Sequence, residues 1–193
     1  ATTEKLSPLA FAYNFMGIEA IKKDPHFLGG NYYGKTLPKD GLSLARMIGT
    51  VTYKSDELFK KRHEDKNFEI EDYLKHQGKT FLRRFDANSY ITLCDAMNSH
   101  NIYKPYPTIQ EALKQIKSKL LMIGIDTDLL YPPNDIKAFV GKLNTVGGFA
   151  RYEEISSMQG HDAFLVDFKS LHPIIEDFLK RPFIKEQTKG QVR

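Results

Sequence analysis

The sequence predicts an α/β protein whose first half is helical. Up to about residue 100, apolar residues recur with a helical period, and no run alternates in the manner of a strand ladder. After residue 105 the order becomes helix, strand, helix, strand, helix with short connections, which is typical of parallel strands joined by helices. Two strands are too few for a stable sheet of this kind, so we expect further strands from a segment upstream of this chain.

Composition fits one sizeable globular core. The chain has 193 residues, 41% of them hydrophobic, a net charge of +4 and one cysteine. No apolar run reaches the eighteen or so residues of a membrane span, and the first residues lack the pattern of a signal peptide, so we expect a cytoplasmic protein without membrane contact. Its lysines are spread along the chain and form no dense basic cluster, which argues against a nucleic-acid partner. The consecutive basic residues Lys60, Lys61 and Arg62 are expected to face solvent, where they could assist an anionic ligand.

The first half contains several expected helices. Ser7 is a typical N-cap and Pro8 suits a first turn, so a helix should run over residues 8–23 and end at Asp24-Pro25. The glycine-rich residues 29–34 predict a loop. The remaining helical segments are expected at residues 41–53, from Asp56 after its cap Ser55, at 68–85 and at 88–99. Cys94 lies in an apolar run of the last segment, which favours a buried packing residue over a nucleophile.

The second half supplies the strands. Thr108 and Glu111 form a capping-box pattern that begins a helix, and residues 119–125 are a short apolar run typical of a strand covered on both faces. Pro132-Pro133 open the next helix, and residues 149–155 alternate as a second strand. A last helix is expected over residues 162–180, with Pro173 as a point where it could break.

Two loops at the carboxyl ends of these strands carry candidate catalytic residues. Asp126 and Asp128 follow the first strand, and His161 follows Gly160 after the second. In a parallel sheet such loops meet at one edge, and an acid followed by a histidine is the order of the last two members of a hydrolase triad. Asp-rich turns are also common as structural caps, so the residues alone leave both interpretations open.

Five separated motifs, in order, resemble the homoserine O-acetyltransferase family of α/β-hydrolase-fold enzymes, over the chain from its first residues to about residue 180. They are residues 6–14 with 24–25 and 29–33, residues 41–49 with Thr52-Tyr53, residues 85–90, Asp128-Leu129-Leu130-Tyr131-Pro132-Pro133, and Gly160-His161-Asp162-Ala163-Phe164.

This resemblance implies a fold and its parts. The chain should be the C-terminal part of an α/β-hydrolase fold with an inserted helical lid. Residues 1–8 would end a core strand and begin a linker, residues 9–105 would form the lid, residues 106–181 would belong to the core, and residues 182–193 would be a polar tail.

The resemblance also implies roles for five residues. Asp128 matches the triad acid and His161 the triad base, which leaves Asp126 as a turn residue. Arg46 and Tyr53 match a substrate-binding pair, in which the arginine fork suits an amino acid's carboxylate. Asp162 matches the acid that pairs with the substrate's ammonium group.

The nucleophile of such a triad is absent from the sequence. No Gly-x-Ser-x-Gly elbow occurs, and the similar Gly41-Leu42-Ser43-Leu44-Ala45 lies inside an expected helix with no strand before it. We therefore expect this chain to be one piece of a longer polypeptide whose missing N-terminal part bears the serine.

The implied reaction is acetyl transfer from acetyl-CoA to the hydroxyl of L-homoserine, in methionine biosynthesis. Acetyl-CoA would be a substrate, and neither a metal nor a tightly bound cofactor is implied. A homodimer through the lid is expected. Two alternatives stay open: a hydrolase or acyltransferase with another donor or acceptor, and a non-catalytic remnant that serves as an interaction module.

Overall fold

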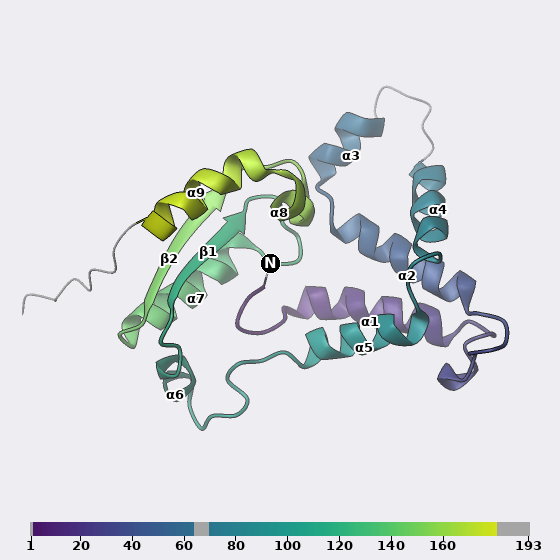
Figure 1. The fold of residues 1–193 in the computed structure, drawn as a ribbon, viewed down its shortest axis with the longest axis horizontal. Helices are drawn as coiled ribbons and strands as arrows, with labels where there is room; N and C mark the ends of the chain where they lie inside the picture. Colours follow the sequence, from purple (N-terminus) through teal and green to yellow (C-terminus); the bar gives the residue numbers. More distant parts are fainter. Residues whose placement is uncertain (1, 64–69, 181–193) are drawn as a thin grey trace, which may run out of the picture.

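The computed structural model describes residues 2–63 and 70–180, which form a helical part and a sheet part (Figure 1). The helical part consists of α1 (Pro8–Lys22), the short 3-10 turn η1 (Leu28–Gly30), α2 (Lys39–Thr52), α3 (Asp56–His63), α4 (Ile70–Phe81) and α5 (Ala87–Ser99). The sheet part consists of α6 (Ile109–Lys114), β1 (Lys119–Ile125), α7 (Pro133–Thr145), β2 (Phe149–Ile155), η2 (Gly160–Asp162), α8 (Ala163–Val166) and α9 (Phe168–Lys180).

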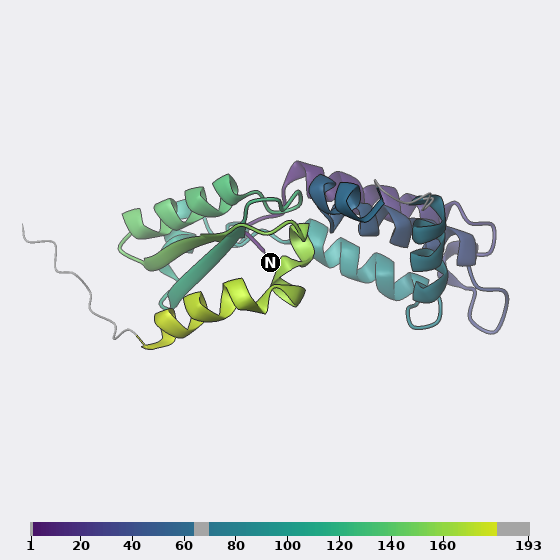
Figure 2. The ribbon, with the colours of Figure 1, turned by 90° about the horizontal axis from the view of Figure 1, so that it is seen from above.

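The two strands form the parallel α/β unit that the sequence predicts. β1 pairs with β2 in register from Lys119 opposite Phe149 to Ile125 opposite Ile155. Helix α7 connects them, and Figure 2 shows α7 and α9 on opposite faces of the sheet. The sheet is therefore covered on both faces, which explains the apolar run of β1, whereas β2 alternates and leaves Glu154 exposed.

The helical part is built on a close approach of α1 and α2. A Cβ atom at Gly41 would lie 2.5 Å from the carbonyl oxygen of Ala20 and 2.8 Å from the Cα of Ile21, so only glycine permits this approach. The buried Asp24 carboxylate accepts a hydrogen bond from the Gly41 N–H (2.8 Å) and joins the end of α1 to the start of α2. Leu42 and its buried neighbours complete this core.

Most expected elements are confirmed, with their caps. The Ser7 hydroxyl accepts from the Ala10 N–H at 3.1 Å and that of Thr108 from the Glu111 N–H at 3.2 Å. Ser43 lies within α2, as expected, and Cys94 is buried in α5. Burial raises the pKa of the Cys94 thiol to about 11, so it is protonated at neutral pH.

One expectation is wrong in detail. The single helix expected over residues 162–180 is instead η2, α8 and α9, and the chain leaves helical geometry at Asp167 (φ −100°, ψ 58°), not at Pro173. The Asp167 carboxylate accepts from the Ser170 N–H and so caps α9. Pro173 stays inside α9. Because proline has no N–H, it cannot donate the helical hydrogen bond to the carbonyl of Lys169, four residues earlier, and Lys169 is exposed to solvent.

Several expectations concern the ends of elements. Among the described residues, Lys5 forms an isolated antiparallel bridge with Asn101, outside the β1–β2 sheet, and the core-strand end expected at residues 1–8 stays a prediction. The polar tail expected at residues 182–193 and the helix start expected at residue 68 lie outside the described residues. Among the helices that the structure describes, none has both the length and the apolar character needed to cross a bilayer.

Candidate active site

The loops that follow β1 and β2 are tied together by hydrogen bonds. The Asp126 carboxylate accepts from the Ser157 N–H at 3.0 Å, and the Thr127 hydroxyl donates to the Ser157 carbonyl at 2.5 Å. The same hydroxyl accepts from the Gly160 N–H at 3.2 Å. Asp126 and Thr127 therefore fix one loop against the other and bring Asp128 and His161 to the same edge of the sheet.

Asp128 and His161 form a buried hydrogen-bonded pair. Asp128 Oδ2 lies 2.8 Å from His161 Nδ1, while Asp128 Oδ1 accepts from the backbone N–H groups of Leu130 (2.8 Å) and Tyr131 (3.0 Å). The Asp128 side chain is 2% exposed and that of His161 14%. An ionised Asp128 places the hydrogen on Nδ1 and leaves Nε2 to accept a proton, which is the arrangement of a triad acid and base.

Aromatic side chains hold the His161 ring on several sides. The Tyr131 ring stacks on it with centroids 5.4 Å apart, and the Phe164 ring meets it edge-on at the same centroid distance. The Tyr53 ring lies at 5.8 Å. The imidazole is thus oriented by packing as well as by its bond to Asp128.

The segment 53–55 of the helical part packs directly against the His161 loop. Gly160 has a φ of +67°, and a Cβ there would lie 2.7 Å from the Ser55 nitrogen and 2.9 Å from the Tyr53 carbonyl oxygen. The Asp162 N–H donates to that carbonyl at 3.2 Å, and the Ser55 hydroxyl donates to the carbonyl of Met158. The glycine before the histidine is therefore required by a left-handed turn and by a backbone contact.

Asp162 forms an ion pair that the sequence did not reveal. Lys54 Nζ lies 2.6 Å from Asp162 Oδ2, and the two side chains are 16% and 23% exposed. Asp162 occupies the N-cap position of α8, but its side chain forms no capping hydrogen bond there. Lys54 carries no sequence signal of its own beyond its place after Tyr53.

Arg46 reaches the same place from α2. Its guanidinium carbon lies 5.6 Å from the centre of the Tyr53 ring and 5.1 Å from that of Phe81. Among the residues that the structure describes, none accepts a hydrogen bond from the buried Arg46 Nε, so a ligand can supply the acceptor. Burial raises the pKa of Tyr53 despite the opposing Arg46 charge, so its hydroxyl stays protonated and can donate.

A pocket of about 380 Å³ lies between the helical part and the His161 loop. It is lined by four of the expected site residues, Arg46, Tyr53, His161 and Asp162. Asp128 lies behind His161 and does not line it. Lining residues that the sequence did not indicate on their own include Asn14 and Arg84, and no local pattern marks either one.

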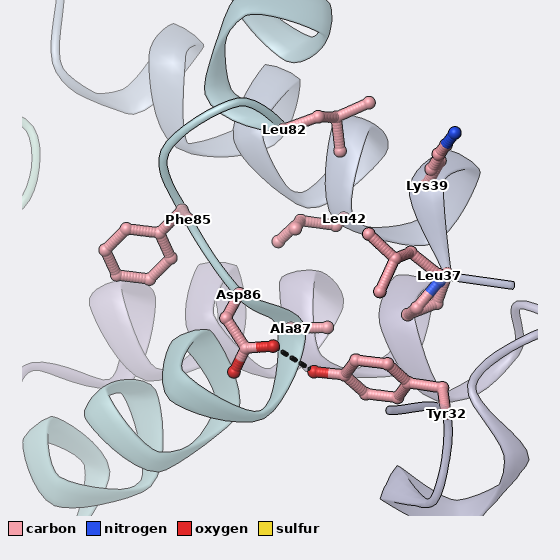
Figure 3. Close-up of a pocket in the computed structure, with 9 residues that line it drawn as sticks. Tyr32, Leu37, Lys39, Leu42, Leu82, Phe85, Asp86 and Ala87 are labelled. Atoms are coloured by element: carbon pink, nitrogen blue, oxygen red, sulfur yellow. Dashed lines mark hydrogen bonds between the residues drawn. The ribbon is translucent and has the colours of Figure 1, made fainter. Parts of the chain in front are cut away.

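A second pocket, of about 160 Å³, lies within the helical part (Figure 3). Its lining includes Leu42, Phe85 and Asp86, and Figure 3 shows the Tyr32 hydroxyl pointing to the Asp86 carboxylate. That carboxylate also accepts from the Ser89 N–H at 2.9 Å, so it serves to hold the start of α5. Within residues 2–63 and 70–180, no cluster of His, Cys, Asp or Glu suited to a metal ion occurs.

The fold and this site define the class of protein. The family model described as alpha/beta hydrolase fold matches residues 6–168, and the chain belongs to that family. Within it, the chain is 46% identical to a homoserine O-acetyltransferase of Carboxydothermus hydrogenoformans, over 93% of this chain and 51% of the relative. A homoserine O-acetyltransferase of Moorella thermoacetica is 40% identical over the same shares.

A solved structure agrees with these relatives. The homoserine O-acetyltransferase of Bacillus anthracis superposes with a TM-score of 0.85 at 26% identity, over 93% of this chain and 52% of that one. The resemblance stated from the motifs is thereby confirmed. The chain spans about half the length of the curated relatives that it matches.

Proposed function

We propose that this chain is the C-terminal part of an acyltransferase that moves the acetyl group of acetyl-CoA to the hydroxyl of L-homoserine. The observation that carries the proposal is the 2.8 Å hydrogen bond between Asp128 and His161 at the wall of a pocket that also holds Arg46. The nucleophilic serine belongs to a segment outside this chain. We call the polypeptide that contains both the full-length protein.

His161 moves the protons of a two-step transfer. Nε2 takes the proton of the serine hydroxyl as its oxygen bonds to the acetyl carbon, and returns a proton to the sulfur as the carbon–sulfur bond breaks and CoA leaves. In the second step Nε2 takes the hydroxyl proton of homoserine, whose oxygen bonds to the acetyl carbon, and the serine oxygen leaves with that proton. Asp128 holds the imidazole in the required tautomer through Nδ1 and stabilises the imidazolium.

The pocket residues hold the acceptor amino acid. Arg46 offers its unpartnered Nε–H and the rest of its fork to the carboxylate. Asp162 receives the ammonium group through the oxygen that Lys54 does not hold. The Tyr53 hydroxyl donates to the bound substrate.

The wider setting belongs to the same proposal. Acetyl-CoA acts as a substrate, without a metal or a tightly bound cofactor. The reaction serves methionine biosynthesis in the cytoplasm, and two copies pair through their helical parts. Exposed apolar side chains on α1, such as Phe11 (46%) and Phe15 (53%), support the pairing.

Two measurements test the proposal. The full-length protein should acetylate L-homoserine from acetyl-CoA faster than it hydrolyses simple esters, and His161→Ala should abolish both activities. The opposite preference would indicate a hydrolase. The 193-residue chain alone should show no turnover, because it lacks the nucleophile. Turnover by the pure chain that is lost on His161→Ala would contradict this account.

A further inference from the structure

Within the described residues, two guanidinium groups that line this pocket have no acidic partner. Asp162, the carboxylate on its lining, is paired with Lys54, and Asp128 behind it is paired with His161. Arg46 and Arg84 both line the pocket, and in the part of the chain that the structure describes neither forms an ion pair. The pocket therefore carries an excess of positive charge, which favours anionic ligands.

The two arginines occupy different depths. Both guanidinium groups lie over the Phe81 ring, Arg46 at 5.1 Å and Arg84 at 5.3 Å from its centre. Arg46 is partly buried and its Nε is enclosed, whereas Arg84 is exposed to solvent. Arg46 is thus the inner cation and Arg84 the cation at the pocket mouth.

We propose that Arg84 binds a phosphate group of the acyl-CoA donor. This inference rests on the proposed acetyl transfer. An amino-acid acceptor has one carboxylate, which the inner Arg46 satisfies. The phosphate-bearing part of an acyl-CoA is much larger than its acetyl group and must remain at the mouth of a pocket of about 380 Å³. An exposed, planar guanidinium at that mouth matches a phosphate in charge and geometry.

The test compares two neighbouring arginines in the full-length protein. Arg84→Gln removes the proposed contact, and Arg83→Gln is the matched control, because Arg83 is also exposed but does not line the pocket. The donors are acetyl-CoA and S-acetylpantetheine, which lacks the phosphates of CoA. Arg84→Gln should raise the KM for acetyl-CoA about tenfold, the low end for a charged hydrogen bond. It should leave kcat, the KM for S-acetylpantetheine and the KM for homoserine unchanged.

Further measurements separate the possible outcomes. Arg84→Lys should recover part of the affinity for acetyl-CoA, because the charge remains and the fork is lost. An equal loss with both donors, or a raised KM for homoserine, would overturn the inference, since Arg84 would then support the site or hold the acceptor. Calorimetric binding of CoA should weaken with Arg84→Gln and not with Arg83→Gln. Equal CoA binding by both variants would overturn the inference about Arg84 and leave the proposed function intact. A full-length protein that binds no CoA would overturn both.

Discussion

Replacing Asp128 by Asn should remove the proposed activity while keeping the fold. Oδ1 of Asp128 accepts two backbone N–H groups, so the amide oxygen of Asn should take that place. The amide NH₂ then faces His161 Nδ1, where Oδ2 lay at 2.8 Å. Nδ1 must become the acceptor and Nε2 must carry the hydrogen, so Nε2 can no longer take a proton from the nucleophile.

The size of the effect follows from this tautomer. In a serine protease triad the corresponding change lowers turnover by about four orders of magnitude, and we expect a similar loss here. The opposite orientation of the amide would set its NH₂ against two N–H donors and is strongly disfavoured. Asp126→Asn is the matched control, because its acceptor oxygen for the Ser157 N–H is retained. We expect it to lower turnover by about tenfold at most.

The assay is steady-state acetyl transfer by the full-length protein, with circular dichroism to establish folding. Nitrogen NMR of the imidazole should show the hydrogen moving from Nδ1 to Nε2 in Asp128→Asn. A crippled Asp126→Asn together with a mild Asp128→Asn would refute the assignment of the acid. Loss of activity without a change of tautomer would refute the mechanism given for it.

Three further changes test other parts of the structure. Arg46→Ala should raise the KM for the amino-acid acceptor about tenfold or more and leave acyl-enzyme formation intact in stopped-flow measurements, and equal losses in both steps would contradict its role. Gly160→Ala should lower the free energy of unfolding in urea by about 2 kcal/mol or more, because φ is +67° and backbone atoms block a Cβ. Gly141→Ala, where a Cβ meets nothing within 4 Å, should raise it by about 0.5 to 1 kcal/mol, and similar effects at both sites would be inconsistent with this reasoning. Burial raises the pKa of Asp24, but hydrogen bonds from backbone N–H groups outweigh it and lower the pKa below the unfolded value. Its stabilisation should therefore be complete above about pH 4 and disappear as the pH falls through the folded pKa, and Asp24→Asn should flatten this acid limb of a stability profile.

The order of elements and the two loops could be predicted from the sequence because their signals are local. Caps such as Ser7 and Thr108 lie three residues from the N–H groups that they accept from. The apolar run of β1 and the prolines before α7 are equally local. Composition alone did not separate Asp126 from Asp128, and the motif after Asp128 selected the acid that contacts His161.

The remaining parts depend on contacts between distant residues. Lys54 and Asp162 are 108 positions apart, and no periodicity links them. Arg84 reaches the pocket only because α4 packs on α2 and places Phe81 beside Arg46. The sequence does not indicate the break at Asp167, because the apolar pattern continues across it into α9. The hydrogen bond from the Ser170 N–H to the Asp167 carboxylate, which begins α9, leaves no signal as strong as that pattern.

The contact between segment 53–55 and the His161 loop also sets an order of events in folding. Ser55 and Met158, which it joins, are 103 positions apart in the sequence. At about 5 to 20 residues per second, a ribosome adds this stretch in roughly 5 to 20 s. The last helix of the helical part, α5, is completed at Ser99 within this interval, so the helical part can fold before the loop that it contacts has been made. The imidazole therefore acquires these surroundings only after residue 161 has been added, and the proposed chemistry comes later than the fold of the helical part.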